Sequence, residues 1–201
     1  MSSPELVDEK VLGRFCKQVE TNRWATTYLF TGKELIRKRE LAIAFAKALN
    51  CLNASSLRGS GQSKAEAISG IASSALRPPR NDVRSCTCAS CKKIESGTHP
   101  DIKWYGRDEE RNSIRISEVR DFKNWLNLKP FEAKVKVFIF DQAEQLTVEA
   151  QNALLKSIEE PPPGNVMIFL VPNVKSLFDT IASRSVEIKV PPFPLKAIKK
   201  F

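Results

Sequence analysis

Short apolar runs alternate with stretches of helical periodicity along most of this chain. The apolar runs predict strands at 27–31, 102–105, 135–140, 166–171 and 186–190, the last of them at an edge. Between them, apolar positions at three- and four-residue spacing predict helices over 4–20, 41–49, 64–76, 116–126, 148–158 and 177–182. Strands that alternate with helices favour a mostly parallel sheet flanked by helices, which is an α/β fold.

The strand 135–140 ends where a ligand could bind. Its near-continuous apolar side chains predict burial on both faces, and the carboxylate of Asp141 follows directly. Phosphate-binding ATPases use a carboxylate at the end of a central strand to hold magnesium, and a neighbouring acid to polarise water. The neighbour here is Gln142, which carries no charge and cannot accept a proton. The segment is either an ATPase strand without its catalytic acid or a plain buried strand with a capping Asp.

The segment 32–39 occupies the place of a phosphate-binding loop, between the first strand and the next helix. In the motif G-x-x-x-x-G-K-[ST], Gly32 and Lys38 stand at the right separation. Arg37 replaces the second glycine, and Arg39 replaces the hydroxyl residue that would touch magnesium. Glycine is used in such loops so that backbone N–H groups can surround the phosphates. We therefore interpret 32–39 as a loop that carries a degenerate nucleotide site.

Length and composition fit one soluble domain with a small appendage. The chain has 201 residues, of which 42% are hydrophobic and 27% are charged. No apolar run reaches the ~20 residues that a membrane span needs, and the start of the sequence lacks an apolar signal core. We expect a cytoplasmic protein without a membrane partner.

The net charge of +9 is uneven along the chain. Residues 1–100 hold 16 Lys and Arg against 9 Asp and Glu, a difference of +7, whereas residues 101–201 hold 16 against 14, or +2. A basic amino-terminal half suggests an acidic partner, of which nucleic acid is the commonest. Lysines dispersed over solvated helix faces explain the same numbers.

Four of the five cysteines have spacings typical of a zinc site. Cys86, Cys88 and Cys91 lie within six residues, and Cys51 precedes them at the end of a predicted helix. Together they complete a Cys₄ set for tetrahedral zinc, with unrelated buried thiols as the alternative. The fifth, Cys16, is interpreted as a free thiol on the first helix. His99, the only histidine, is interpreted as part of a turn rather than as a ligand.

The chain is expected to divide at its composition shifts. We assign residues 1–191 to one domain, which contains a zinc module at about 51–97 with a surface insertion at 53–85 rich in Ser, Ala, Gly and Arg. Residues 192–201 begin with prolines and continue into a basic stretch. We expect them to be a linker and the start of a truncated helical lid domain.

Several of these features together resemble one family. They are Gly32 and Lys38 before a helix ending in Leu-Asn-Cys51, the cysteine cluster before Gly-Thr-His-Pro-Asp101, Phe-Ile-Phe-Asp141, the segment 151–162 (Gln-Asn-Ala-Leu-Leu-Lys-Ser-Ile-Glu-Glu-Pro-Pro), and Ser183-Arg184-Ser185. The combination resembles the bacterial clamp-loader branch of the AAA+ ATPases, over most of the chain outside 53–85. The resemblance implies a P-loop NTPase-like sheet of five parallel strands.

Within that family the chain is similar to the subunits that keep the ATPase fold without turning over ATP. These place an arginine of a Ser-Arg-Cys motif against ATP on the neighbouring subunit, and Arg184 stands at that position although Ser185 replaces the Cys. The resemblance implies a non-catalytic member of the replicative polymerase assembly. Its expected partners are sister clamp-loader subunits, the sliding clamp and primed DNA. An active ATPase with a degenerate loop and a zinc-dependent nucleic-acid-binding module are the alternatives.

Overall fold

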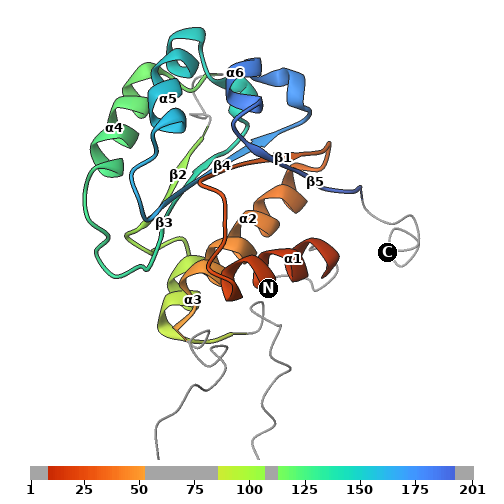
Figure 1. Cartoon of the computed structure of the whole chain (residues 1–201), viewed down its shortest axis with the longest axis vertical. Coiled ribbons are helices and arrows are strands. Elements are labelled where there is room, and N and C mark those ends of the chain that lie inside the picture. The colour runs from red at the N-terminus through yellow and green to blue at the C-terminus, as the bar shows by residue number, and fades with distance from the viewer. Residues whose placement is uncertain (1–8, 53–85, 107–112, 193–201) are drawn as a thin grey trace, which may run out of the picture.

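The computed structural model describes residues 9–52, 86–106 and 113–192. Over these ranges the chain forms a parallel sheet of five strands in the order β2-β3-β4-β1-β5 (Figure 1). The strands are β1 (Thr27–Thr31), β2 (Ile102–Tyr105), β3 (Lys136–Phe140), β4 (Asn165–Val171) and β5 (Val186–Lys189). The helices are α1 (Glu9–Glu20), α2 (Leu35–Asn50), α3 (Ala89–Glu95), α4 (Ile116–Leu126), α5 (Val148–Glu159) and α6 (Asp179–Ala182). The predicted fold class is therefore confirmed.

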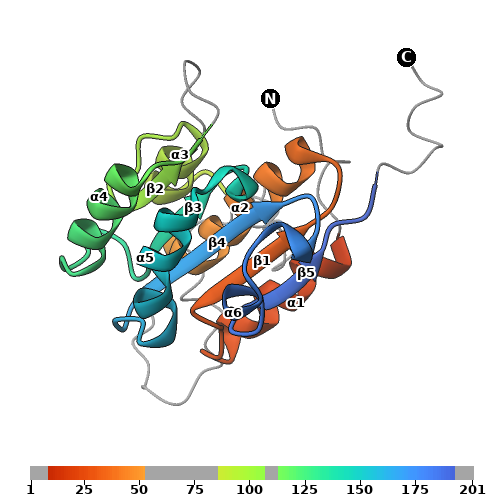
Figure 2. The same ribbon diagram turned by 90° about the horizontal axis from the view of Figure 1, so that it is seen from above.

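The helices form one layer on each face of the sheet, which gives a three-layer arrangement (Figure 2). One core combines α1, α2 and α3 with side chains of one face, among them Val166, Ile168 and Leu170 of β4. The other core combines α4, α5 and α6 with the alternate side chains of the same strand, Met167, Phe169 and Val171. Since every residue of β4 is buried, an unbroken apolar run is the pattern that such a strand needs.

All five predicted strands are present, and 186–190 lies at an edge as expected. The strand 135–140 is buried on both faces, but it is the second strand in order, and β4 occupies the middle of the sheet. In α4, Val119, Phe122 and Leu126 are buried, whereas Ile116 and Trp125 are 37% and 39% exposed. The helix is therefore present as predicted, but the core covers only three of its five large apolar side chains.

Other helix predictions differ from the structure at their ends. The helix predicted at 177–182 begins only at Asp179, because Leu177 closes the preceding 3-10 turn. The first residues of the predicted helix 4–20, the predicted helix 64–76, the insertion 53–85 and almost all of the expected linker 192–201 lie outside the described residues.

Buried polar side chains fix the loop that enters β3. The carboxylate of Asp101 accepts hydrogen bonds from the backbone N–H groups of Phe131, Glu132 and Ala133, each at 2.8 Å. His99 accepts a hydrogen bond from the N–H of Asp101 at 3.2 Å through Nδ1, which fits its interpretation as a turn residue. These contacts hold the chain as it leaves α4 and turns back into the sheet.

Lys136, the first residue of β3, stabilises the end of α4. Its ammonium is buried and donates to the carbonyl oxygens of Trp125, Leu126 and Leu128. The last carbonyls of a helix have no partner within the helix, and a cation there also interacts favourably with the helix dipole. A charged side chain inside the sheet is tolerated because it completes this helix end.

Candidate functional site

The structure brings the four residues of the predicted nucleotide site to one edge of the sheet. Gly32 follows β1, Asp141 and Gln142 follow β3, and Lys38 lies in the first turns of α2. In a parallel sheet these carboxyl ends meet at the edge where α/β proteins bind ligands. The segment between β1 and α2 is only Gly32, Lys33 and Glu34, since α2 begins at Leu35. The prediction of a loop over 32–39 is therefore wrong, because five of its residues are helical.

Lys38 is directed into the protein rather than into an open loop. Its side chain is buried, and Nζ donates to the backbone carbonyl oxygen of Val171 at 2.7 Å. Burial lowers the pKa of Lys38, although the nearby carboxylates of Glu144 and Asp141 act in the opposite direction. The ammonium therefore links α2 to the end of β4.

The two arginines that replace the motif residues also find partners within the chain. Arg39 pairs with Asp141: Nε donates to Oδ2 at 2.8 Å, and a terminal nitrogen contacts the same oxygen. Arg37 is buried and donates to the carbonyl oxygen of Pro192 at 2.6 Å. The guanidinium of Arg39 thus supplies the positive charge that a bound cation would bring to Asp141.

The backbone of the chain itself closely surrounds Gly32 at this edge. The N–H of Gly32 donates to the carbonyl oxygens of Val171 and Pro172, at 3.3 and 3.2 Å. Gly32 has a φ of +152°, and a Cβ on it would lie 2.6 Å from the carbonyl oxygen of Val190. Gln142 adopts the left-handed conformation, with φ 49° and ψ 52°. The N–H of Gly32 and the ammonium of Lys38 therefore already donate to the chain's own carbonyl oxygens.

The four cysteines of the predicted zinc site come together at the ends of two helices. Cys51 follows the last residue of α2, Cys88 precedes α3, and Cys91 lies within it. The four sulfur atoms lie within 4.8 Å of one another, and those of Cys51 and Cys86 are 3.4 Å apart. Tetrahedral zinc with Zn–S bonds of ~2.3 Å places its sulfurs about 3.8 Å apart. The donor set and its spacing therefore fit a metal ion.

The thiols influence each other's protonation. Hydrogen bonding with Cys51 and burial raise the pKa of Cys91, and burial raises that of Cys86. Burial acts in the same direction at Cys88, but the backbone N–H groups of Cys91 and Leu52 hold its pKa below the ordinary value. Next to the cluster, Lys47 of α2 pairs with Glu95 of α3 at 2.9 Å. This ion pair joins α2 to α3 beside the cysteine cluster.

Arg184 lies at the opposite edge of the sheet. It precedes β5, and the amino end of a parallel strand is remote from the carboxyl ends that carry Gly32 and Asp141. One terminal nitrogen donates to the carbonyl oxygen of Thr180 at 3.2 Å, and the other lies 3.2 Å from a carboxylate oxygen of Glu159. The nearby carboxylate of Glu187 in β5 accepts a hydrogen bond from the hydroxyl of Thr31, at 2.8 Å.

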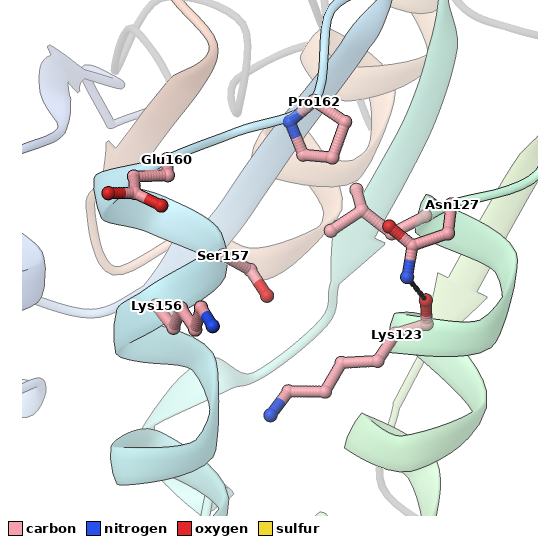
Figure 3. Close-up of a pocket in the computed structure, with 7 residues that line it drawn as sticks. Lys123, Asn127, Lys156, Ser157, Glu160 and Pro162 are labelled. Atoms are coloured by element: carbon pink, nitrogen blue, oxygen red, sulfur yellow. Dashed lines mark hydrogen bonds between the residues drawn. The ribbon is translucent and has the colours of Figure 1, made fainter.

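A groove of about 290 Å³ separates the carboxyl ends of α4 and α5. Its lining residues are Lys123, Leu126, Asn127, Lys156, Ser157, Glu160 and Pro162. Figure 3 shows the side chain of Lys123 reaching into the gap from α4, with Ser157 opposite it on α5. Glu160 belongs to this groove, whereas the preceding residue, Glu159, pairs with Arg184.

The family model for the DNA polymerase III delta subunit matches residues 7–75 and 57–194. This chain belongs to that family. It is 28% identical over 94% of its length to the DNA polymerase III subunit delta' of Bacillus subtilis, and 29% identical over 83% to that of Pseudomonas aeruginosa. These matches cover 49% and 43% of the two relatives, so the chain spans about half the length of the curated proteins it resembles.

Other DNA polymerase III subunits show comparable sequence or structural similarity to this chain. The DNA polymerase III subunit tau of B. subtilis is 30% identical over 81% of the chain and is covered over 24% of its own length. The crystal structure of a DNA polymerase III gamma subunit-related protein from Thermotoga maritima superposes with a TM-score of 0.58, at 22% identity. That superposition covers 95% of this chain and 48% of the other, and it supports the fold.

Sequence reasoning missed the roles of two charged residues: Glu159 pairs with Arg184, and Lys136 binds the carbonyl oxygens at the end of α4. Glu159 was visible only as part of the segment 151–162, and nothing in the sequence pairs it with Arg184. Lys136 had no signal beyond a charge within an apolar strand.

None of the described helices is long and apolar enough to cross a membrane.

Proposed function

We propose that this chain is a non-catalytic subunit of a DNA polymerase III clamp loader, which helps to load the sliding clamp onto primed DNA. The observation that carries the proposal is the nucleotide edge of the sheet, where Lys38 and Arg39 bind the chain's own carbonyl and carboxylate groups. The family membership supports the complex in which such a subunit would act. An active ATPase would need Lys38 to leave Val171 and a water to be activated without an acid at position 142.

Arg184 is the residue through which the subunit would act, as an arginine finger on ATP held by a neighbouring subunit. A guanidinium is suited to this role because it is planar, always charged, and able to fork two hydrogen bonds onto phosphate oxygens. The position of Arg184 at the edge away from Gly32 and Asp141 supports action in trans rather than on the chain's own site. Its partial exposure leaves the guanidinium accessible to another subunit.

The proposed partners are sister clamp-loader subunits of the ATPase and delta types, with the clamp and primed DNA bound through the complex in the cytoplasm. Residues 1–191 would form the AAA+-like domain, with the zinc module at about 51–97, and residues 192–201 would lead into a further domain. The proposed ion at Cys51, Cys86, Cys88 and Cys91 is structural zinc. Four cysteine ligands complete a tetrahedral ion and leave no position open for chemistry.

The test of the finger is an Arg184→Ala subunit assembled with wild-type sister subunits. Assembly and ATP binding should persist, while DNA- and clamp-stimulated hydrolysis and clamp loading should fall. Removal of such a finger typically costs ~10³–10⁵ in phosphoryl-transfer rate, and less where other fingers of the ring still act. Loading at the wild-type rate would show that Arg184 is structural.

A further inference from the structure

The guanidinium of Arg184 is held between two elements of its own chain. Its terminal nitrogens contact the carbonyl oxygen of Thr180 in α6 and a carboxylate oxygen of Glu159 in α5, both at 3.2 Å. The side chains of Arg184 and Glu159 are 43% and 48% exposed. The charged end of the arginine therefore lies at the surface and contacts two acceptors of its own chain.

Both acceptors are on packed elements. Glu159 follows Ile158, which is buried in the second core, and the prolines 161–163 come directly after the helix end. The carbonyl of Thr180 lies next to the buried Ile181. The arginine, in contrast, has a long side chain whose rotamer freedom must be lost whenever it binds a phosphate. The fixed acceptors can therefore place a side chain that would otherwise move.

We propose that Glu159 is the positioning residue of Arg184, orienting its guanidinium for ATP on the neighbouring subunit. This inference rests on the proposed trans role of Arg184. A guanidinium has five N–H donors, so donors remain for phosphate oxygens while Thr180 and Glu159 hold the group in place. Phosphoryl transfer depends on precise placement of such charges, and a loosely held arginine would have to be ordered in the transition state itself.

This geometry determines how much the loss of Glu159 should slow ATP hydrolysis and which kinetic constant should change. Since the pair is half-exposed, its loss should reduce the rate by only about two- to fivefold, far less than loss of the arginine. The reduction should fall on kcat, because ATP is bound by the neighbouring subunit and Glu159 does not touch it. A residue with a merely structural role would lower assembly or stability instead.

The test compares Glu159→Gln with Glu160→Gln in the chain assembled with its sister ATPase subunits. The control removes the adjacent carboxylate, at a residue that lines the groove between α4 and α5. We expect Glu159→Gln to lower the kcat of DNA- and clamp-stimulated ATP hydrolysis by about two- to fivefold, with the KM for ATP unchanged. Glu160→Gln should behave as wild type.

Arg184→Ala, alone and combined with Glu159→Gln, separates this inference from the proposed function. If Glu159 acts through Arg184, the double variant has the same rate as Arg184→Ala. A wild-type or higher rate for Glu159→Gln beside an impaired Arg184→Ala would overturn the positioning role and leave the finger intact. A further loss in the double variant would also overturn it. A wild-type rate for Arg184→Ala would refute the proposed finger role of Arg184 and this inference together.

Discussion

Individual side chains at the nucleotide edge have partners that no local pattern reveals. The replacements Arg37, Arg39 and Gln142 were read directly from the sequence, but their contacts were not. Lys38 binds the carbonyl of a residue 133 positions away, and Arg39 pairs with a carboxylate 102 positions away. Such contacts depend on strand order, which alternation of strands and helices does not determine. The sequence therefore indicated a degenerate site without showing that the chain's own side chains fill it.

Gly32 is a residue at this edge whose surroundings leave no space for a side chain. Gly32→Ala should lower the free energy of unfolding by about 2–4 kcal/mol, because the new Cβ would lie 2.6 Å from the carbonyl oxygen of Val190. Gly164→Ala is the control, since Gly164 also has a positive φ, +75°, but open space around its Cβ position. It should cost only about 1 kcal/mol. Urea denaturation measures both, and equal losses would show that the close approach at Gly32 is unimportant.

Asp101 should make stability depend on pH. Burial raises the pKa of this carboxyl group, but the backbone N–H groups of Glu132, Phe131 and Ala133 outweigh it and hold the pKa below the ordinary value. A lowered folded-state pKa gives stability that is complete above the unfolded value of about 3.9 and is lost as pH falls through the folded pKa.

Asp101→Asn tests this linkage. The amide cannot accept all three hydrogen bonds, so the variant should be less stable by about 2 kcal/mol at pH 7. The difference from wild type should narrow below about pH 4, where the Asp101 carboxylate of the unfolded wild-type chain begins to protonate. Denaturation curves at several pH values measure the gap, and a gap that stays constant would contradict the assigned role.

At the scale of elements, strands were predicted better than helix ends. The runs of β1, β3 and β4 are distinctive because both faces of these three strands are buried. The start of α2 was misplaced because a phosphate-binding loop was expected through position 39. Nothing in Leu35-Ile-Arg-Lys-Arg breaks a helix, and Arg37 and Lys38 are satisfied by distant carbonyls. Trp125 and Ile116 have helical spacing, yet the neighbouring layer does not cover them fully.

The stability of the junction between α2 and α3 should depend on a bound metal ion. Elemental analysis of protein purified without chelator should find about one zinc per chain, and Cys91→Ser should lose zinc and stability, since a bound structural ion contributes directly to folding. Cys16→Ser is the control, because Cys16 lies on α1 outside the cluster. Less than about 0.2 zinc per chain, together with folding unaffected by chelator, would exclude the metal.

At the scale of the whole molecule, the carboxyl and amino ends of the parallel strands carry different charged side chains. The carboxyl edge is closed by the chain's own Lys38 and Arg39, while the amino edge carries Arg184 at the surface. The isolated chain should therefore show no micromolar affinity for Mg-ATP in calorimetric titration, and no hydrolysis above background. Micromolar binding or turnover that disappears in Lys38→Ala would show that the edge opens. The family and fold were predictable at this scale because the helix 148–158 and its prolines are specific, and the comparisons confirm both.

The buried ammonium of Lys136 allows chemical labelling to report on the end of α4. Acylating reagents need an accessible amine, and this one is enclosed by three carbonyl oxygens, whereas Lys129 and Lys134 in the same connection are exposed. Brief treatment of the folded chain should label those two lysines and leave Lys136 intact, as peptide mass spectrometry would measure. Labelling of Lys136 would then occur only when α4 detaches from the sheet. The rate at which Lys136 is acylated would therefore measure how often α4 detaches from the sheet.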